Sequence, residues 1–168
     1  DLPPPNMDLR AKLGIPKNKF VFGRHGGYST FDLPFVHAMI ATIASKRDDI
    51  VFLMANTNKF FEHPNIVYLP SFFGAQETSN FVNACDAMIH GRKDGETFGL
   101  SICDFLFHNK PVLAWEQGLN LNHVTLLGKY GLLYNEKTLA DKMIHLREVV
   151  DRDYRSIVEP YTPKNVMK

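Results

Sequence analysis

DAMIHGRKDGETFGLSICDFLFHNKPVLAW, residues 86–115, carries the clearest sign of the fold class in this chain. Its pattern predicts a short apolar strand over residues 86–90 and a second one over 111–115. Between them it predicts a charged, glycine-rich turn and then a helix over 98–107 that is buried nearly all round. Short, continuous apolar strands joined through helices are typical of a parallel sheet covered on both faces, so the stretch predicts an α/β fold.

The same alternation of strands and helices extends in both directions from this stretch. Three earlier strands are predicted, over residues 19–23, 50–54 and 66–69. A helix that Asp32 caps and a helix over 76–84 accompany them. A weak strand is predicted over 131–134, and one helix face is marked by Leu139, Met143, Leu146 and Val150. The whole pattern predicts a Rossmann-like, doubly wound parallel sheet.

The first fifteen residues are predicted to lead into the domain. Pro3, Pro4 and Pro5 disfavour a helix and favour an extended segment, as in many linkers between domains. We therefore expect a linker or lead-in over residues 1–15 and one Rossmann-like domain over 16–168. Residues 161–167 resemble the beginning of a final helix, and we expect the chain to be a fragment of a longer two-domain protein.

The composition excludes several classes of protein. A chain of 168 residues that is 45% hydrophobic and 12% aromatic suits one globular domain with a sizeable core. A formal net charge of +1 gives no reason to expect nucleic acid as a partner, and no apolar run is long enough to span a membrane. Cys85 and Cys103 lie in apolar runs without metal-ligand spacing, which favours buried, reduced thiols. Without a signal peptide at its start, the chain is expected to be cytoplasmic.

Two turns that follow predicted strands carry the candidate binding site, because ligands of a doubly wound sheet bind at the carboxyl ends of its strands. The first turn combines Arg24 with Gly26 and Gly27. Glycines let backbone N–H groups approach an anion, and arginine makes bidentate contacts with phosphate oxygens. The turn lacks the spacings of dinucleotide-binding and P-loop motifs. It is predicted to cradle a phosphate; the alternative is an ordinary tight turn whose arginine faces solvent.

The second turn precedes the helix of the quoted stretch and is richer in charge. Arg92 and Lys93 are cationic, Gly95 and Gly99 allow a close approach of the backbone, and the N-terminal dipole of the helix is directed at the same place. An anion is therefore expected there. Glu96 beside an anion indicates another task, such as accepting hydrogen bonds from sugar hydroxyls. The alternative is an acidic residue that is merely favoured near a helix start.

A second carboxylate, Asp104, follows Glu96 by eight residues. At about 1.5 Å per helical residue the two lie no more than about 12 Å apart, with the helix N-terminus between them. The apolar neighbours of Asp104 indicate a mostly buried helix, in which an unpaired carboxylate is costly, so we expect it to have a partner. A solvated position is the alternative. A nucleoside diphosphate sugar has the matching layout: hexose hydroxyls, an anionic diphosphate and a ribose diol.

Histidines lie at both turns as well. His25 and His90 are at the ligand-facing strand ends, and the other histidines are predicted to be surface or packing residues, with no pair at metal-ligand spacing. Asn120, Asn122 and His123 follow a third strand end and are a further candidate border of the sugar site.

These residues resemble the C-terminal, nucleotide-sugar-binding half of GT-B glycosyltransferases, especially the retaining family 4. Gly23-Arg24 resembles the phosphate turn of that family. Residues 96–104, Glu-Thr-Phe-Gly-Leu-Ser-Ile-Cys-Asp, are similar to its E-x-F-G-L-x-x-x-E motif, and residues 109–114 resemble its small-residue-Pro-Val-Val strand. The resemblance covers nearly the whole chain and implies one half of a GT-B fold.

The resemblance also implies a role for each residue of the site. Glu96 and Arg24 are expected to be catalytic: Glu96 contacts sugar hydroxyls near the reacting carbon, and Arg24 neutralises the diphosphate. Asp104 is expected to hold the ribose. The other expected substrate-binding residues are Gly26, Gly27, Leu69, Pro70, His90, Arg92, Lys93, Thr97, Phe98, Gly99 and Leu100, of which Leu69 and Pro70 line the pocket for the base.

The implied reaction transfers a hexose from a nucleoside diphosphate sugar, with retention of the anomeric configuration. No metal and no cofactor are implied, because basic side chains and a helix dipole stabilise the leaving diphosphate. The expected partners are the nucleotide-sugar donor and an acceptor that is a glycan, a lipid or a protein. The acceptor would bind an N-terminal domain that is missing from this chain.

Two departures from the family pattern keep alternatives open. Ser29 stands where the family usually has a lysine five residues after the arginine, so Arg92 or Lys93 is expected to substitute for that charge. Asp104 stands in place of a glutamate. The alternatives are a non-catalytic nucleotide or nucleotide-sugar-binding module and a GT-B-type nucleotide-sugar epimerase. A phosphorylase is disfavoured because no lysine is marked as a holder of pyridoxal phosphate.

Overall fold

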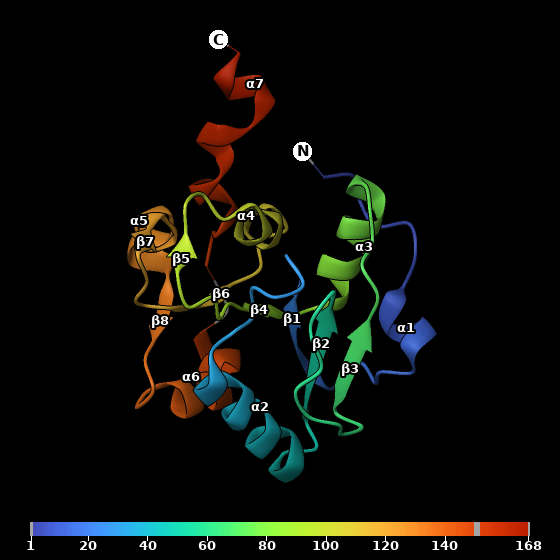
Figure 1. Ribbon diagram of the computed structural model, residues 1–168. Coiled ribbons are helices and arrows are strands. Elements are labelled where there is room, and N and C mark those ends of the chain that lie inside the picture. The colour runs from blue at the N-terminus through green and yellow to red at the C-terminus, as the bar shows by residue number, and fades with distance from the viewer. Residues whose placement is uncertain (1, 150–151, 168) are drawn as a thin grey trace.

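A parallel sheet forms the centre of the computed structural model, which describes residues 2–149 and 152–167. The strands lie in the order β3-β2-β1-β4-β6-β8, and neighbours are parallel throughout (Figure 1). Their bounds are β1 Phe20–Arg24, β2 Ile50–Ala55, β3 Ile66–Leu69, β4 Ala87–Ile89, β6 Val112–Trp115 and β8 Leu132–Tyr134. Successive strands are added on one side of β1 up to β3 and then on its other side from β4 onwards, while all strands stay parallel. This order is that of a Rossmann-like sheet, and the predicted α/β fold is confirmed.

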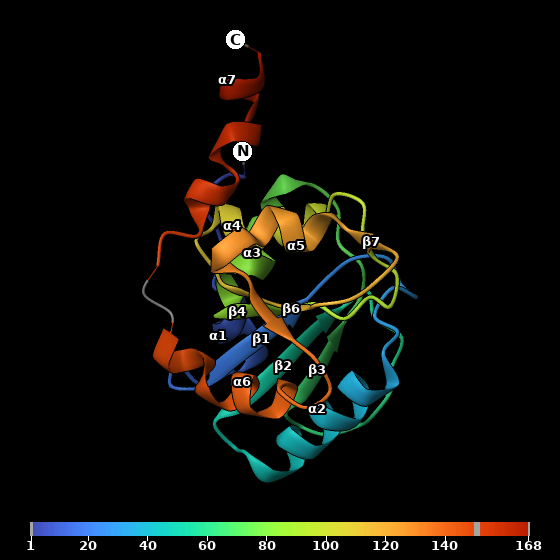
Figure 2. The ribbon, with the colours of Figure 1, turned by 90° about the vertical axis from the view of Figure 1, so that its left-hand side faces the viewer.

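Helices cover both faces of the sheet. The described α-helices are α1 Leu9–Leu13, α2 Pro34–Lys46, α3 Ala75–Ala84, α4 Leu100–Phe107, α5 Asn122–Leu127, α6 Leu139–His145 and α7 Pro163–Val166. The described 3-10 helices are η1 Gly128–Tyr130, η2 Leu146–Val149, η3 Arg155–Ile157 and η4 Glu159–Tyr161. In both ribbon views α2 and α6 lie on one side of the sheet, and α3 and α4 lie on the other (Figures 1 and 2). Among the described residues, no helix is long and apolar enough to cross a membrane.

The core is divided by the sheet into two clusters. In β1, Phe20 and Phe22 pack in the cluster that contains the apolar residues of α2 and α6. Val21 between them belongs to the opposite cluster, with residues of α3 and α4. Alternate residues of a strand point to opposite faces, so a sheet with helices on both faces needs strands that are apolar at every position. This explains why the strands were legible in the sequence as continuous apolar runs.

Two predictions about the helices are wrong. Asp32 does not cap α2: the N-cap is Leu33, and Asp32 Oδ1 accepts a hydrogen bond from Lys93 N at 2.8 Å. α4 begins at Leu100 rather than at residue 98, and Leu100 is 73% exposed, so the helix is not buried all round. Its buried face consists of Ile102, Phe105 and Leu106. Cys103 on the same helix is only partly buried, whereas Cys85 is fully buried; both are free thiols.

A second, two-stranded parallel sheet was not predicted. It pairs β5, Gly95–Glu96, with β7, Asn120–Leu121, and α5 follows directly after β7. Strands of two residues and a helix of six are too short to give a periodic signal. The small sheet fastens the turn that carries Glu96 to the segment after β6. Val150, predicted on the face of the helix at residue 139, lies outside the described residues, and α6 with η2 accounts for the rest of that face.

Part of the expected lead-in is helical. α1 lies within it, with Asp8 as an N-cap whose side chain accepts a hydrogen bond from Ala11 N. Asn6 N donates to Asn80 Oδ1 at 3.0 Å, which connects the lead-in to α3. Residues 1–15 as a linker between domains stay a prediction.

Candidate functional site

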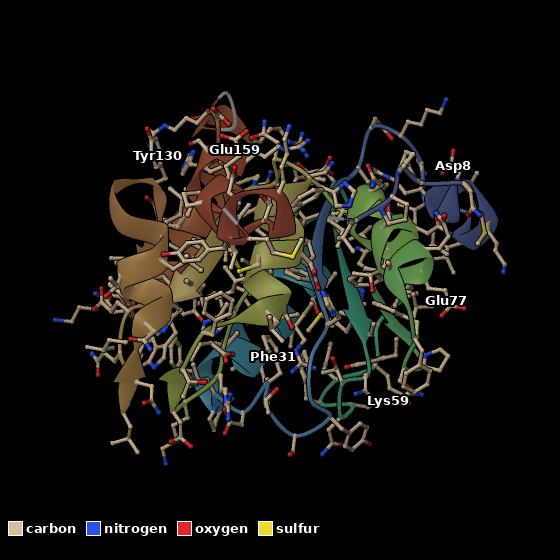
Figure 3. The ribbon with its side chains drawn as sticks, turned by 90° about the horizontal axis from the view of Figure 1, so that it is seen from above. Asp8, Phe31, Lys59, Glu77, Tyr130 and Glu159 are labelled. Atoms are coloured by element: carbon tan, nitrogen blue, oxygen red, sulfur yellow. The ribbon has the colours of Figure 1, made fainter. Side chains whose placement is uncertain are left out.

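A cavity of about 280 Å³ opens at the carboxyl ends of β1 and β4, where the order of the sheet reverses. It brings together most of the residues predicted from the sequence. The predicted residues that line it are Arg24, Gly26, Gly27, His90, Arg92, Glu96, Thr97, Phe98, Gly99 and Leu100. Phe31 also lines it and lies near the middle of the molecule in the view from above, with Tyr130 and Asp8 towards opposite sides (Figure 3). The cavity therefore occupies the switch point at which doubly wound folds bind ligands.

Four predicted residues lie outside this cavity. Leu69 and Pro70 line a neighbouring cavity of about 390 Å³ together with Phe72. Asp104 lines another one, of about 220 Å³. Lys93 is exposed, and its backbone N–H is bonded to Asp32. Ligand binding by these four residues stays a prediction.

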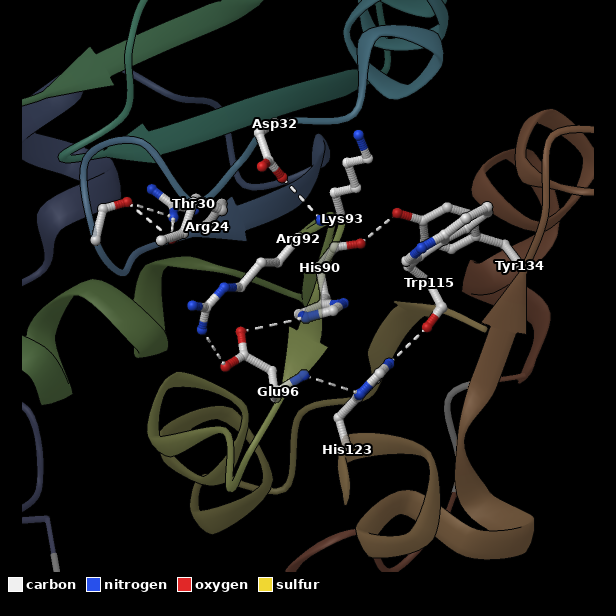
Figure 4. A network of polar contacts seen from close by, with 11 residues as sticks. Arg24, Thr30, Asp32, His90, Arg92, Lys93, Glu96, Trp115, His123 and Tyr134 are labelled. Carbon is white, nitrogen blue, oxygen red and sulfur yellow. Dashed lines mark hydrogen bonds and ion pairs between the residues drawn. The ribbon is translucent and has the colours of Figure 1, made fainter. Parts of the chain in front are cut away.

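Glu96 is held from two sides. Its Oε1 lies 3.4 Å from His90 Nε2, and its Oε2 accepts a hydrogen bond from Arg92 Nη1 at 3.1 Å (Figure 4). Partial burial of Glu96 by itself raises the pKa of its carboxyl group, but the contacts with His90 and Arg92 outweigh it and lower that pKa below its usual value. The cavity therefore contains an ionised carboxylate at neutral pH.

His90 is buried at the end of β4. Burial lowers the pKa of its imidazole, although the neighbouring Glu96 opposes the shift, so the ring is neutral at pH 7. Neither ring nitrogen makes a well-aligned hydrogen bond with any described residue. The backbone is fixed separately, because Tyr134 Oη donates a hydrogen bond to the His90 carbonyl (Figure 4). His90 thus presents a neutral imidazole beside the Glu96 carboxylate.

Arg24 is 3% exposed and lies beneath the first turn. Its Nη2 donates to Gly27 O at 2.8 Å and to Thr30 Oγ1 at 2.6 Å, within that turn. Its Nη1 donates to Asn56 O and Thr57 Oγ1, both at 3.1 Å, in the segment after β2. Burial lowers the pKa of the guanidinium to about 10, while the charges of Glu96 and Asp32 raise it, so the group stays cationic. Arg24 therefore places a positive charge at the base of the cavity. It also connects the turn after β1 to the segment after β2.

The N-terminus of α4 contributes backbone donors. Gly99 is the N-cap with φ of +87°, a conformation that favours glycine, and it has no side chain to bond the first N–H groups of the helix. Leu100 and Ser101 of the first turn line the cavity. Free N–H groups and the helix dipole attract anions at such a position. The site therefore has cationic and N–H donors around one carboxylate.

Asp104 is partly buried and lies beside a histidine. Its Oδ2 lies 3.3 Å from His25 Nε2. The ring of His25 in turn packs against Phe72 and Phe81 at centroid distances of 5.4 and 5.6 Å. His25 also lines the main cavity, so this pair connects the cavity to the residues around Phe72.

His123 is the main residue that the sequence interpretation undervalued. It is fully buried, its Nδ1 accepts a hydrogen bond from Glu96 N at 3.3 Å, and its Nε2 is bonded to Trp115 O at 2.6 Å (Figure 4). The only signal for it was its place after the third strand end. The contact itself depends on the pairing of β5 with β7, which could not be predicted from local pattern.

The described residues contain no group of three or more His, Cys, Asp or Glu side chains that could hold a metal ion.

Several solved proteins have a similar fold. Anabaena Alr3699/HepE in complex with UDP-glucose superposes with a TM-score of 0.69 at 18% identity, over 89% of this chain and 45% of that one. TarM superposes with a TM-score of 0.66 at 16% identity, over 90% of this chain and 35% of that one. The chain thus spans less than half the length of these two proteins.

A solved single domain matches over nearly its full length. The C-terminal domain of the glycosyl transferase group 1 family protein LpcC from Francisella tularensis superposes with a TM-score of 0.63 at 14% identity, over 92% of this chain and 93% of that domain. No protein-family profile and no curated protein sequence matches this chain. The fold is therefore that of the C-terminal half of GT-B glycosyltransferases, as the sequence predicted.

Proposed function

We propose that this chain is the donor-binding half of a retaining glycosyltransferase that transfers a hexose from a nucleoside diphosphate sugar. The observation that carries the proposal is the shared cavity of Glu96, Arg24, Arg92 and the N-terminus of α4. A carboxylate for hydroxyl groups and donors for a diphosphate lie within one small volume. Support also comes from HepE, which has the same fold and was solved in complex with UDP-glucose.

The diphosphate would bind at the N-terminus of α4, with Gly26, Gly27 and Arg92 around it. Its negative charge is matched there by the helix dipole and the guanidinium groups. The Arg24 guanidinium adds positive charge at the base of the cavity, while its described hydrogen bonds are made to oxygens of this chain. Lys93 or Arg92 compensates for the lysine that Ser29 replaces. Of these two, the structure favours Arg92, since it lines the cavity and Lys93 does not.

Glu96 would accept hydrogen bonds from hydroxyls of the hexose, beside Thr97, Phe98, Gly99 and Leu100. Its carboxyl group is ionised at neutral pH and already oriented by His90 and Arg92. As the bond between the anomeric carbon and the diphosphate oxygen breaks, negative charge grows on the diphosphate. Donors fixed in advance at α4 stabilise that charge, which is the main way such a site accelerates the reaction without a metal.

The nucleoside would extend towards Asp104, Leu69 and Pro70. Asp104 holds the ribose and the loop after β3 holds the base. His25 connects the two regions, because it lines the main cavity and lies 3.3 Å from Asp104. The acceptor, a glycan, lipid or protein, would bind a second domain, so this chain alone is expected to bind the donor without transferring the sugar.

Calorimetric titration with UDP, GDP and their hexose conjugates tests the proposal. We expect one conjugate to bind more tightly than its bare nucleotide, by about tenfold if the hexose contacts contribute about 1.4 kcal/mol. The Glu96→Ala variant should lose this gain and keep its affinity for the nucleotide. Glu136→Ala, at an exposed position outside the cavity, is the control and should behave as the unmodified chain does.

Three other results are informative. Nucleotide binding with no gain from any sugar would support a non-catalytic nucleotide-binding module, the alternative that Ser29 favours. Formation of a sugar isomer from the bound donor would support an epimerase. Absence of binding to all nucleotides and conjugates would contradict the proposed donor site.

A further inference from the structure

The residue behind Glu96 is His123, from the segment that follows β7. The side chain of Glu96 contacts His90 and Arg92. Its backbone N–H is bonded as well, to Nδ1 of His123 at 3.3 Å. The acceptor lies 27 positions further along the chain, in the first turn of α5.

The two hydrogen bonds of His123 define its protonation state. Trp115 O is a carbonyl oxygen and accepts only, so Nε2, 2.6 Å away, must carry the hydrogen. Glu96 N is a donor, so Nδ1 must be the unprotonated nitrogen. The ring is therefore the neutral Nε2–H tautomer, and both of its nitrogens are used.

His123 also packs against His90, one of the two side chains that contact the Glu96 carboxylate. Its ring lies 4.8 Å from the ring of His90, centroid to centroid, and His90 Nε2 lies 3.4 Å from Glu96 Oε1. The ring is completely buried, so the surrounding side chains leave it little freedom to turn. His123 thus touches both the backbone of Glu96 and the residue next to its carboxylate.

The neighbouring backbone is packed as closely. A Cβ atom on Gly95 would lie 3.0 Å from Cε1 of His123 and 1.9 Å from Asn120 O. The pairing of Gly95 with Asn120 and of Glu96 with Leu121 brings the two loops into register. The hydrogen bond from Glu96 to His123 is therefore part of a fixed joint between the turn after β4 and the segment after β6.

We propose that His123 is a positioning residue that sets the place of Glu96 towards the donor sugar. It touches no substrate itself; it acts through the backbone of Glu96 and through His90. The inference rests on the proposed function for its effect on sugar binding, whereas its effect on Glu96 is measurable without any ligand. Because Glu96 and not the diphosphate site depends on it, the sugar contribution to binding and not the nucleotide contribution should change.

The test compares His123→Phe, which keeps a ring and removes both hydrogen bonds, with His123→Gln, which offers an oxygen to Glu96 N and an N–H to Trp115 O. The first readout is calorimetry. We expect His123→Phe to lower the sugar-dependent gain by about tenfold, equal to about 1.4 kcal/mol, with the affinity for bare nucleotide within twofold. His123→Gln should restore most of the gain. His145→Phe, at an exposed position on α6, is the control.

The second readout needs no ligand. Hydrogen exchange of the Glu96 amide should be slow in the unmodified chain, faster in His123→Phe and slow again in His123→Gln. Long-range nitrogen–proton NMR of the unmodified chain should show His123 as the neutral Nε2–H tautomer. Because the tautomer is measured on the unmodified chain, this result does not depend on whether a His123 variant folds.

The outcomes separate the two proposals. If the unmodified chain shows no sugar-dependent gain, the proposed function fails, and the amide exchange and the tautomer alone decide the inference. A His123→Phe variant that keeps both the full gain and slow exchange at Glu96 would overturn it. So would an Nδ1–H tautomer, because that nitrogen could not then accept from Glu96.

Discussion

Arg24 has more to do than its predicted role as a phosphate ligand requires. The sequence indicated an arginine available to a phosphate, and its burial with four hydrogen bonds to protein atoms came only from the structure. The guanidinium joins the turn after β1 to the segment after β2. Removal of the guanidinium breaks all four bonds, including the two that connect the loops at Asn56 and Thr57.

We expect Arg24→Met to destabilise the chain by about 2–3 kcal/mol, because Asn56 O and the buried hydroxyl of Thr57 lose the donor that Arg24 provides. Urea denaturation followed by circular dichroism measures this. Arg92→Met is the matched control: the Arg92 side chain is 38% exposed and bonded to Glu96, so its loss should cost about 0–1 kcal/mol. Equal costs for the two variants would contradict a structural role for Arg24.

The β5–β7 pair is the element that completes the site. It consists of two residues in each strand, and it holds Glu96 against the segment that carries His123. Gly95 adopts φ of +71° and lies so close to Asn120 O that no side chain fits. The pair therefore depends on glycine at this position, for reasons of both conformation and space.

Gly95→Ala and Gly14→Ala separate these two reasons, because both glycines have φ of +71°. At Gly14 a Cβ would meet nothing within 4 Å, so only the left-handed conformation is penalised, by about 1–2 kcal/mol. At Gly95 the backbone of Asn120 must also move, which adds about 1–3 kcal/mol. Free energies of unfolding from urea titration are the measurement. If Gly95→Ala lowers the free energy of unfolding by no more than Gly14→Ala does, the backbone of the β5–β7 pair can shift to accommodate a side chain at little energetic cost.

At the scale of the whole molecule, one sheet separates two apolar clusters that share its strands. Phe22 and Val21 are neighbours in β1 and belong to different clusters. Neither cluster keeps its packing if the other side of the sheet is lost. The molecule should therefore unfold as one cooperative unit.

Trp115, the single tryptophan, lies in β6 and belongs to the cluster with α2 and α6. We expect its fluorescence and the far-ultraviolet circular dichroism of the helices to change with coincident midpoints in urea, within about 0.2 M given a slope of about 1–3 kcal/mol/M. Two separate midpoints would contradict a single cooperative unit. Trp115→Phe, which removes the fluorescence signal, should leave the circular dichroism transition in place with a modest shift.

The strands of the large sheet and the two turns of the site could be predicted from local sequence pattern. Strands buried on both faces are apolar at every position, so β1, β2 and β3 were visible within one residue of their ends. Glycine and charge directly after such strands marked Arg24 and Glu96, because in this class of sheet the strand ends are where ligands bind. These signals lie within short segments of sequence, so they can be recognised without knowing which segments pack together.

The residues that support the site from behind became visible only in the packed structure. The hydrogen bond from Glu96 to His123, the contact of Asp104 with His25, and the bonds of Arg24 in the segment after β2 all join residues that are far apart along the chain. Asp32 shows the same limit. Its position before α2 suggested a helix cap, but its carboxylate instead accepts a hydrogen bond from Lys93 N on a distant loop. A short polar side chain bonds whichever partner the packed loops bring within reach, and sequence spacing carries no record of that distance.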